Sequence, residues 1–474
     1  MRTRNERFIS HLLARQHVAS PSVLAATRTK TAENPPPEFT WREYAGFLLS
    51  VAAQIEHSLM VQYLYAAWSL GGMQVPAEQR NSVAAWRQTI LGIAKEEMGH
   101  LATVLNLLRF LDAPIELDRE DYPWDSGLAP YPFALERLTR ATLAKYILAE
   151  SPEQWPADVT SAERAEIEKL AAGSGTKHIN RVGILYAELI DLFKDAARLP
   201  NSAFHPETYP TQSSWDEYAR GYGKGARGSS VAGTKKTPDV LVMRASSRAE
   251  AVAALAAVAE QGEAPDEAAM KDDEVSHFRR FLKVFREFPE AGAWEATIAV
   301  PSNPAAPGMP SGAEQTLIQD DQAGLWANIF NIRYRMLLSF LAHSHAPIGP
   351  DGLVQRQGII VNRMFGEMYN LRAIASVLTR LPLKPNGADR AGAPFQMPYT
   401  LQLPDDDASF WRLHLDLLKA CRALLLNPKI ASGDAAEYAA TLLSLDETAV
   451  EEMSLYASAS KVRTGVLRPT GAIA

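Results

Sequence analysis

Two copies of a Glu-x-x-His motif constrain the fold of this chain more than any other feature of its sequence. They are Glu97-Met98-Gly99-His100 and Glu274-Val275-Ser276-His277. Residues three apart on a helix face the same way, so a carboxylate and an imidazole can reach one metal ion from a single helix. Apolar residues recur at helical spacing around both motifs, which predicts two long helices with the motifs facing inward. One match arises readily by chance, whereas two on inward faces favour a helical bundle around metal.

The rest of the chain carries further helical patterns and few segments with strand character. The first pattern runs over residues 41–70, with an apolar stripe through Leu59 and Tyr63, and ends at Gly71. The other predicted helices span residues 78–111, 134–150, 177–197, 247–260, 267–287, 322–343, 352–381, 408–426 and 432–458. We therefore predict an all-α protein with an N-terminal arm at 1–38, a metal-binding bundle at 39–300 with an insertion at 200–240, and a C-terminal helical region at 313–474.

A dinuclear carboxylate site in a bundle needs one more glutamate from each of two other helices. Glu56 fits one place because it lies on the apolar stripe of the first helix. For the other place Glu188 is favoured because its helix is longer, and Glu150, at the end of the preceding helix, is the alternative. Glu263 follows Gly262 at a break in the pattern and is either a ligand or a loop residue. Burying these carboxylates alone would cost roughly several kcal/mol each, and two divalent ions would neutralise them.

Plainer interpretations exist for several of these residues. Glu274 follows the charged run Lys271-Asp272-Asp273, which is typical of a solvated surface, and Glu188 could be an ordinary surface carboxylate. Glu96 is turned away from the site by helical geometry, which suits a supporting role rather than ligation. The pair His343 and His345 stands at a helix end, where loop histidines are commoner than a second metal site.

Composition narrows the kind of metal and the kind of partner. Oxygen and nitrogen donors without thiolate suit iron or manganese better than copper(I), and zinc stays open. Cys421 is the only cysteine, which excludes an intrachain disulfide and thiolate-rich sites. The net charge of −7 argues against a nucleic-acid partner. Residues 1–17 lack the apolar core of a leader and no apolar run approaches a bilayer span, so we expect a soluble cytoplasmic protein without a membrane partner.

Several segments resemble a known family, the ferritin-like family that includes the iminophenyl-pyruvate dimer synthases. Those enzymes are similar to the imine dimer synthases of violacein and rebeccamycin biosynthesis. The segments that carry the resemblance are Ile55-Glu56-His57 with Gln62 to Ala66, Glu96 to His100 with Asn106 to Leu108, Glu150-Ser151-Pro152, Val182-Gly183 to Tyr186, Gln261-Gly262-Glu263, Glu274 to His277, and Phe330-Asn331 to Tyr334. The chain departs from the family at Ile184, where an acidic residue often follows the glycine, and this departure keeps Glu150 as an alternative to Glu188.

The resemblance implies a ferritin-like four-helix bundle with an additional C-terminal helical region. Together with the motifs, it predicts two iron ions, with manganese as the alternative. The predicted ligands are Glu56, Glu97, His100, Glu188 or Glu150, Glu274 and His277, with Glu263 left open and with Glu97 or Glu274 as the bridge.

The ions would activate dioxygen or peroxide, and the protein would hold a small organic substrate under the C-terminal helices and the 200–238 insertion. The substrate expected from the resemblance is an amino-acid-derived imine of secondary metabolism. Iron storage without catalysis, a haem-dependent imine dimer synthase and a metal-free scaffold are the rival functions. The sequence leaves the oligomeric state open, a homo-oligomer included.

Overall fold

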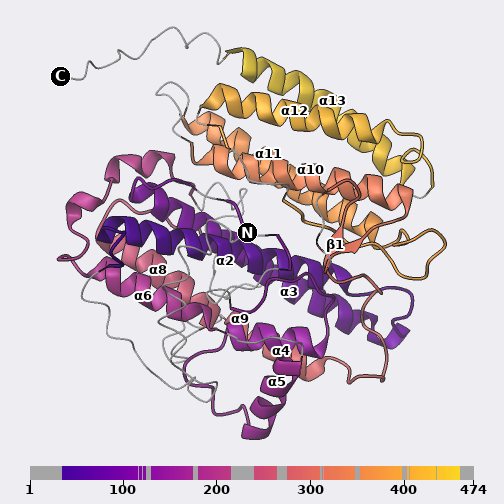
Figure 1. Ribbon diagram of the computed structural model, residues 1–474, viewed down its shortest axis with the longest axis horizontal. Helices are drawn as coiled ribbons and strands as arrows, with labels where there is room; N and C mark the ends of the chain where they lie inside the picture. The colour runs from indigo at the N-terminus through magenta and orange to yellow at the C-terminus, as the bar shows by residue number, and fades with distance from the viewer. Residues whose placement is uncertain are drawn as a thin grey trace, which may run out of the picture.

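In the computed structural model the regular secondary structure of the described residues is almost all helical, which confirms the predicted fold class (Figure 1). It describes residues 35–115, 117–119, 121–123, 130–173, 180–214, 240–263, 275–309, 312, 314–346, 353–397, 403–404, 406–433 and 435–459. Among these residues the strand structure is limited to a two-residue parallel pair, β1 (Pro304–Ala305) and β2 (Thr316–Leu317). No helix in the described part of the chain is long and apolar enough to cross a bilayer.

The described helices follow the predicted order closely. Their bounds are α2 (Trp41–Ser69), α3 (Arg80–Phe110), α4 (Arg140–Ala149), α5 (Ser161–Gly173), α6 (Val182–Lys194), α8 (Arg248–Glu263), α9 (His277–Glu287), α10 (Asp321–Ser344), α11 (Leu353–Leu378), α12 (Asp407–Leu425) and α13 (Ala436–Ala459), with short 3-10 turns at Ala77–Gln79, Asn201–Ala203 and Pro206–Thr211.

Two long neighbouring helices, α2 and α3, form the spine of the protein (Figure 1). A capping box starts α2, because the Thr40 side chain accepts a hydrogen bond from the Glu43 backbone amide and the Glu43 carboxylate accepts one from the Thr40 amide. The helix ends just before Gly71, whose positive φ of 109° suits glycine. The short connection makes α2 and α3 antiparallel, as the sequence predicts.

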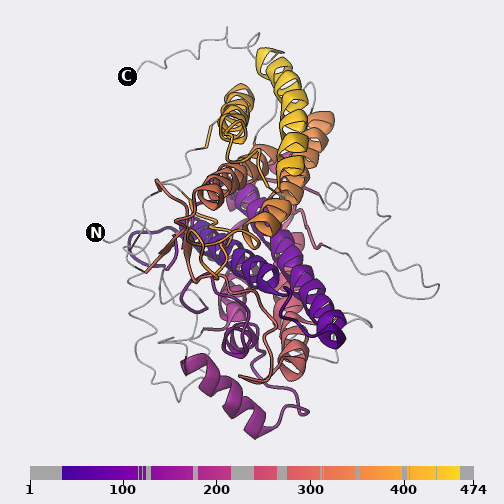
Figure 2. The same ribbon diagram turned by 90° about the vertical axis from the view of Figure 1, so that its right-hand side faces the viewer.

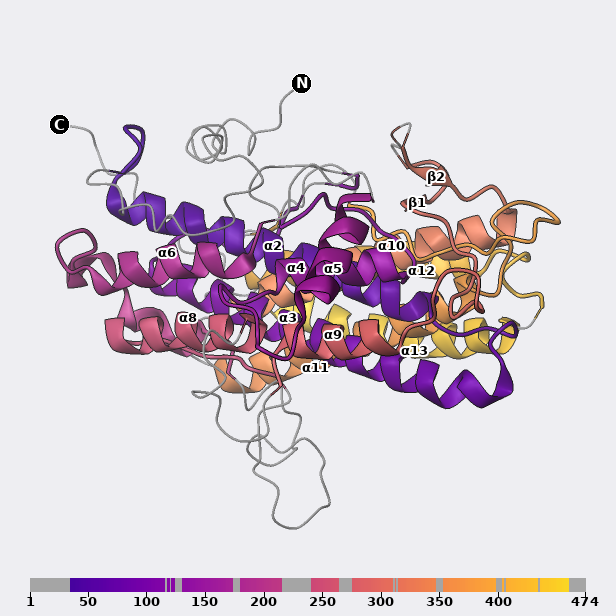
Figure 3. The same cartoon turned by 90° about the horizontal axis from the view of Figure 1, so that it is seen from below.

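The other two positions of the bundle are each filled by two shorter helices rather than by one long one. Helix α6 packs against α8, and α4 packs against α9, so that α4 and α6 lie in one row and α8 and α9 in another (Figure 3). Val275 and Ser276 are not helical and α9 begins at His277, so the predicted helix over 267–287 is not continuous through these two residues, and its residues 267–274 lie outside the described part of the chain. Ser276 is the N-cap, and its side chain accepts a hydrogen bond from the Arg279 amide.

Helix α5, which packs against α4, was not predicted from the sequence. Ile167 and Ala171 are its buried residues, and the helix otherwise faces solvent. A helix with so narrow an apolar stripe gives a weak periodic signal. It lies at the end of the molecule opposite α13 (Figure 2).

The four C-terminal helices α10 to α13 form a separate layer that covers one side of the spine (Figures 1 and 2). Trp68 of α2 stacks on Phe395 with ring centroids 5.4 Å apart and meets Phe330 of α10 edge-on. His57 of α2 hydrogen-bonds the Tyr334 hydroxyl of α10. The C-terminal layer therefore packs on the face of α2 that carries His57, one residue beyond Glu56.

Gly99, inside the first Glu-x-x-His motif, allows an extended segment to cross α3 in direct contact. A Cβ atom at this position would lie 2.6 Å from Val240 Cγ1 and 2.7 Å from the Leu241 carbonyl oxygen. The Thr103 hydroxyl donates to that same carbonyl oxygen at 3.2 Å and accepts from the Met243 amide at 3.1 Å. A backbone fixed by these bonds has little freedom to retreat.

We therefore expect Gly99→Ala to lower the free energy of unfolding by about 1–3 kcal/mol, the usual cost of overpacking a close contact. Gly366 in α11 is the matched control, because a Cβ there would meet nothing within 4 Å. Gly366→Ala should stabilise the protein by about 0.5–1 kcal/mol, since alanine is the better helix former. Urea denaturation of both variants measures the contrast, and an unchanged midpoint for Gly99→Ala would contradict the packing argument.

Candidate metal centre

The candidate centre lies where the interrupted helices break, beside the middle of the two unbroken ones. Glu150 is the C-cap residue of α4, and His277 is the first residue of α9. Glu56 comes from α2, and Glu97 and His100 come from α3. All five residues are buried, each at most 2% exposed, so their charges require partners inside the protein.

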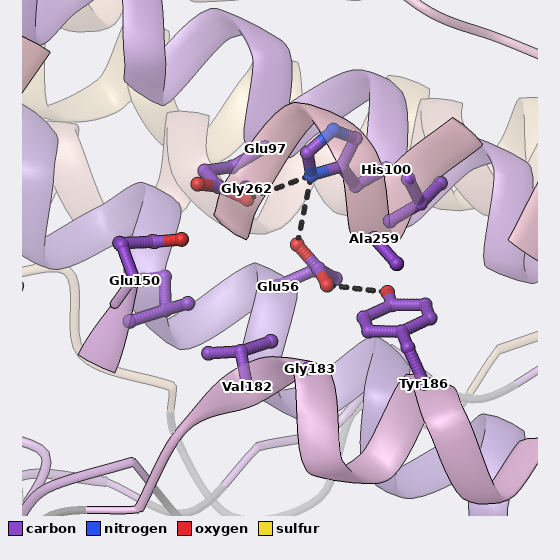
Figure 4. Close-up of a pocket in the computed structure, with 11 residues that line it drawn as sticks. Glu56, Glu97, His100, Glu150, Val182, Gly183, Tyr186, Ala259 and Gly262 are labelled. Atoms are coloured by element: carbon purple, nitrogen blue, oxygen red, sulfur yellow. Dashed lines mark hydrogen bonds and ion pairs between the residues drawn. The ribbon is translucent and has the colours of Figure 1, made fainter. Parts of the chain in front are cut away.

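One group of ligand atoms forms between α2 and α3. His100 Nδ1 lies 3.0 Å from Glu97 Oε2 and 3.4 Å from Glu56 Oε2, as the dashed lines in Figure 4 show. One donor atom from each of these three residues lies within 4.8 Å of the others, close enough to coordinate a single ion.

A second group forms at the helix ends and shares Glu97 with the first. His277 Nδ1 lies 2.9 Å from Glu97 Oε1 and 3.7 Å from Glu150 Oε2. Donor atoms of Glu97, Glu150 and His277 also lie within 4.8 Å of one another. Glu97 thus presents one oxygen to each group, which is the arrangement of a carboxylate that bridges two ions.

The residues fit a pair of metal ions on the evidence of their unsatisfied atoms. Glu56 Oε2, Glu97 Oε1 and His277 Nδ1 are buried and make no well-oriented hydrogen bond to a described residue, although the last two lie 2.9 Å from each other. These atoms all face the interior shared by the two groups. Buried polar atoms are normally hydrogen-bonded, and an unsatisfied cluster of carboxylate oxygen and imidazole nitrogen is the donor set that iron, manganese or zinc prefers.

The outer nitrogen of each imidazole is fixed by an acceptor. His100 Nε2 lies 2.8 Å from Gln261 Oε1, and His277 Nε2 lies 3.0 Å from Glu96 Oε2. Arg280 in turn donates to Glu96, with Nη1 3.2 Å from Oε1. Although burial raises the pKa of Glu96, the hydrogen bond from His277 and the charge of Arg280 lower it to about 2. An ionised acceptor favours the proton on His277 Nε2 and leaves the Nδ1 lone pair for a metal.

Because the ligand candidates are buried close together, the pKa values of Glu56 and the two histidines favour protonation when no metal is bound. Burial and then the Glu97 charge raise the pKa of Glu56 to about 8. Burial lowers the pKa of His100, but its hydrogen bonds to Glu56 and Glu97 outweigh this effect and raise the pKa to about 10. Burial also lowers the pKa of His277, but the Glu97 charge and the neighbouring carboxylates of Glu150 and Glu96 raise it well above the usual value. At neutral pH the metal-free cluster therefore keeps a proton on Glu56 and holds both histidines protonated.

Five of the eight residues that the sequence analysis proposed as ligands come together here: Glu56, Glu97, His100, Glu150 and His277. The structure does not bring Glu188 to the centre, because Glu188 is half-buried and its Oε1 accepts a hydrogen bond from Tyr44 Oη at 2.7 Å. Glu188 lies two residues beyond Tyr186, about 200° around α6 from the residue that faces the site. Glu274 is outside the described residues, and Glu263 ends α8 with a side chain that the structure does not describe.

Two tyrosines that the sequence analysis did not assign also belong to the centre. Tyr186 Oη donates a hydrogen bond to Glu56 Oε1 (Figure 4), and Tyr63 Oη donates to Glu150 Oε1 at 2.6 Å. Tyr63 lies seven residues after Glu56, on the same stripe of α2, and this spacing is a signal that the sequence does contain.

The small cavity at the centre is lined by ligand candidates and by apolar residues. Its lining residues are Glu56, Leu59, Glu97, His100, Glu150, Val182, Gly183, Tyr186, Val258, Ala259 and Gly262. These residues come from α2, α3, α6, α8 and the end of α4. None of the described residues of α10 to α13 lines this cavity, and residues 215–239 of the predicted insertion lie outside the described part of the chain. The predicted roof over a substrate stays a prediction.

His343 lies in the last turn of α10 rather than in a loop, whereas His345 is the C-cap residue just beyond the helix. Both are fully buried at the end of α10. His343 lies between two neighbours, with Nε2 2.9 Å from Asp407 Oδ1 and Nδ1 3.2 Å from His414 Nε2. These contacts join α10 to α12.

The chain matches one family model and is similar to two enzymes of known activity. The family model described as Ferritin-like matches residues 49–286, which include the five clustered ligand candidates. A dichlorochromopyrrolate synthase from Lentzea aerocolonigenes is 25% identical over 377 residues, covering 72% of this chain and 35% of the relative. A 2-imino-3-(indol-3-yl)propanoate dimerase from Chromobacterium violaceum is 32% identical over 137 residues, covering 23% of this chain and 13% of the relative.

The chain thus spans about a third or less of the length of these two relatives. A crystal structure of a ferritin-like protein from Caulobacter vibrioides superposes with a TM-score of 0.41 at 14% identity, covering 76% of this chain and all of the other.

Proposed function

The chain belongs to the ferritin-like family, and on this basis we propose that it is an enzyme that uses a pair of iron ions to oxidise or couple a small organic substrate. The observation that carries the proposal is the single carboxylate, Glu97, shared between two buried groups of carboxylate and imidazole donors. Two ions held around one bridging carboxylate are typical of redox chemistry in helical bundles. Manganese in the same site is the alternative.

The names of the relatives support an enzyme rather than a storage protein. One is a synthase and the other a dimerase of an imino acid that carries an indole ring. We propose the same class of substrate for this chain, an amino-acid-derived imine of secondary metabolism. Joining two such molecules through a new bond removes two electrons and two protons from them, and dioxygen or peroxide would accept these.

The roles of the protein residues follow from their positions. The bound iron pair would supply the redox step between the substrate and dioxygen. Glu56, Glu97, His100, Glu150 and His277 would hold it. The apolar residues Leu59, Val182, Val258 and Ala259 also line the cavity, where they would exclude water. Both nitrogens of His100 and of His277 already face protein atoms, so axial ligation of a haem would have to break one of these contacts.

Metal content tests the proposal directly. Wild-type protein should contain about two iron ions per chain by mass spectrometry, and His100→Ala and His277→Ala should each lose metal. His205→Ala is the control, because this partly exposed histidine pairs with Glu207 away from the centre and should not affect metal content. An absorption spectrum of haem would support the haem-dependent alternative. Loading of far more iron without turnover of an imine would support storage, and protein free of metal after careful purification would support a scaffold.

Metal binding near neutral pH should release protons. Glu56 and His100 hold theirs up to pKa values of about 8 and about 10, and a metal ion binds the carboxylate and the neutral imidazole. Calorimetric titration at pH 7 in two buffers of different ionisation enthalpy should therefore give different observed heats. Because Glu56 loses its proton as the pH rises through about 8, fewer protons should be released at pH 9 than at pH 7. Equal heats in both buffers would show that the cluster is not protonated.

A further inference from the structure

Glu56 and Glu150 each belong to one of the two donor groups, whereas Glu97 belongs to both. In Glu56 and in Glu150, one carboxylate oxygen accepts a hydrogen bond from a tyrosine. Tyr186 of α6 donates to Glu56 Oε1, and Tyr63 of α2 donates to Glu150 Oε1 at 2.6 Å. All four side chains are buried. The same tyrosine-to-carboxylate hydrogen bond therefore occurs in both donor groups, with the two tyrosines on different helices.

The uncapped oxygen of each carboxylate is the one that faces a histidine. Glu56 Oε2 lies 3.4 Å from His100 Nδ1, and Glu150 Oε2 lies 3.7 Å from His277 Nδ1. Glu56 Oε2 has no hydrogen-bond partner among the described residues. In both carboxylates one oxygen is engaged by a phenol and the other is directed at the candidate metal position.

Glu97 differs from these two carboxylates. Its Oε2 faces His100 at 3.0 Å and its Oε1 faces His277 at 2.9 Å, so each oxygen is directed at a different group. Glu97 thus directs both oxygens at candidate metal positions, whereas Glu56 and Glu150 direct one oxygen each. A carboxylate can bind a metal through one oxygen or both, and a hydrogen bond to one oxygen disfavours its use as a second ligand.

We propose that Tyr63 and Tyr186 are positioning residues that restrict Glu150 and Glu56 to ligation through one oxygen and leave Glu97 to bridge. The inference rests on the proposed metal pair. Its consequence is chemical: a carboxylate bound through one oxygen takes one coordination position on its ion instead of two. A position is thereby left on each ion for substrate or oxidant. The phenols act through the carboxylates and need not touch either reactant.

Phenylalanine substitutions test the proposal, because they remove the hydroxyl and keep the ring. Tyr146→Phe is the matched control: Tyr146 is equally buried, packs its ring 4.7 Å from Tyr63, and directs its hydroxyl to the Gln62 carbonyl oxygen at 3.5 Å rather than to a carboxylate. Each variant would be loaded with ferrous iron without oxygen, and its thermal unfolding would be compared with that of wild type to establish that it folds.

Infrared difference spectra between metal-free and iron-loaded protein report how the carboxylates bind. The splitting between the two carboxylate stretches is large for binding through one oxygen and small for binding through both. We expect Tyr186→Phe and Tyr63→Phe each to shift part of the carboxylate signal to the smaller splitting. Each should also weaken iron binding at its own position by about 10- to 100-fold, the usual effect of losing an outer hydrogen-bond partner. Tyr146→Phe should match wild type in both measurements.

The outcomes separate this inference from the proposed function. Wild type that binds two ions, with Tyr63→Phe and Tyr186→Phe indistinguishable from Tyr146→Phe, would overturn the role of the tyrosines and leave the metal pair intact. Wild type that binds no iron would overturn both. A shift of the splitting in the two variants, absent from the control, would support the proposal.

Discussion

The Glu97→Gln substitution is expected to weaken metal binding at both positions at once. Glu97 is the residue that the two groups share, with one oxygen 3.0 Å from His100 Nδ1 and the other 2.9 Å from His277 Nδ1. The amide removes a negative charge from a buried site and replaces one ligand oxygen with an NH2 group that cannot coordinate. We expect the affinity for metal to fall by at least about 100-fold at each position, because losing a ligand should cost more than losing a hydrogen-bond partner of a ligand. Turnover should fall to background.

Comparison with two other substitutions shows whether Glu97 bridges. Glu150→Gln should weaken binding at one position and spare the other, because Glu150 belongs to one group alone. Glu188→Gln should leave two ions bound, because Glu188 pairs with Tyr44 outside the cluster. Calorimetric titration with ferrous iron gives the stoichiometry of all three variants. If Glu97→Gln lost a single ion, or none, the bridging role would be wrong.

The second large effect concerns stability and lies in the C-terminal layer. Arg333 of α10 is 1% exposed, with Nη1 3.0 Å from Glu367 Oε1 of α11, and it also donates to Asp446 of α13. Arg333→Met would leave two buried carboxylates without their cation. Breaking a buried ion pair in this way costs about 3–5 kcal/mol, so we expect a loss of that size in the free energy of unfolding.

The control removes the charges together. Arg333→Met combined with Glu367→Leu and Asp446→Leu leaves no unpaired charge, and such replacements are often neutral or stabilising.

The defect of Arg333→Met should also depend on pH. Burial raises the pKa of both Glu367 and Asp446, so the folded state takes up protons more readily than the unfolded state, and stability falls as the pH rises. The defect of Arg333→Met should therefore shrink as the pH is lowered from 7 toward 5. Urea denaturation measures both effects, and a triple variant as unstable as the single one would contradict the explanation.

The parts of the fold that the sequence predicts best are those that local pattern determines. Helices α2 and α3 are long and lie within two residues of the predicted bounds. The first Glu-x-x-His motif lies on one of them, so its geometry follows from helical spacing alone. Ligand candidates on these two helices came together as expected.

The breaks in the other two positions of the bundle could not be read from the same pattern. Apolar periodicity continues across residues 267–287, yet the structure starts α9 at His277, where the Ser276 cap competes with continued helix. The choice between Glu150 and Glu188 as the ligand likewise depended on where a helix ends. Glu150 reaches the centre because it caps α4, whereas Glu188 points away from the centre and pairs with Tyr44 of α2. Helical spacing does not specify where residues beyond a helix end will point.

The partners around the ligands depend on tertiary contacts. Gln261 meets His100 across 161 residues of sequence, and Tyr186 meets Glu56 across 130. No local spacing connects such residues, so they become visible only when the helices pack. Glu96 is intermediate: helical geometry indicates that it turns away from Glu97, but its bond to His277 requires the position of α9.

Anomalous X-ray scattering from crystals of the iron-loaded protein tests the central claim most directly. We predict two peaks at the iron edge, one contacting Glu56, Glu97 and His100 and the other contacting Glu97, Glu150 and His277. An anomalous map without a peak between these side chains, or with iron bound elsewhere in the chain, would contradict the account.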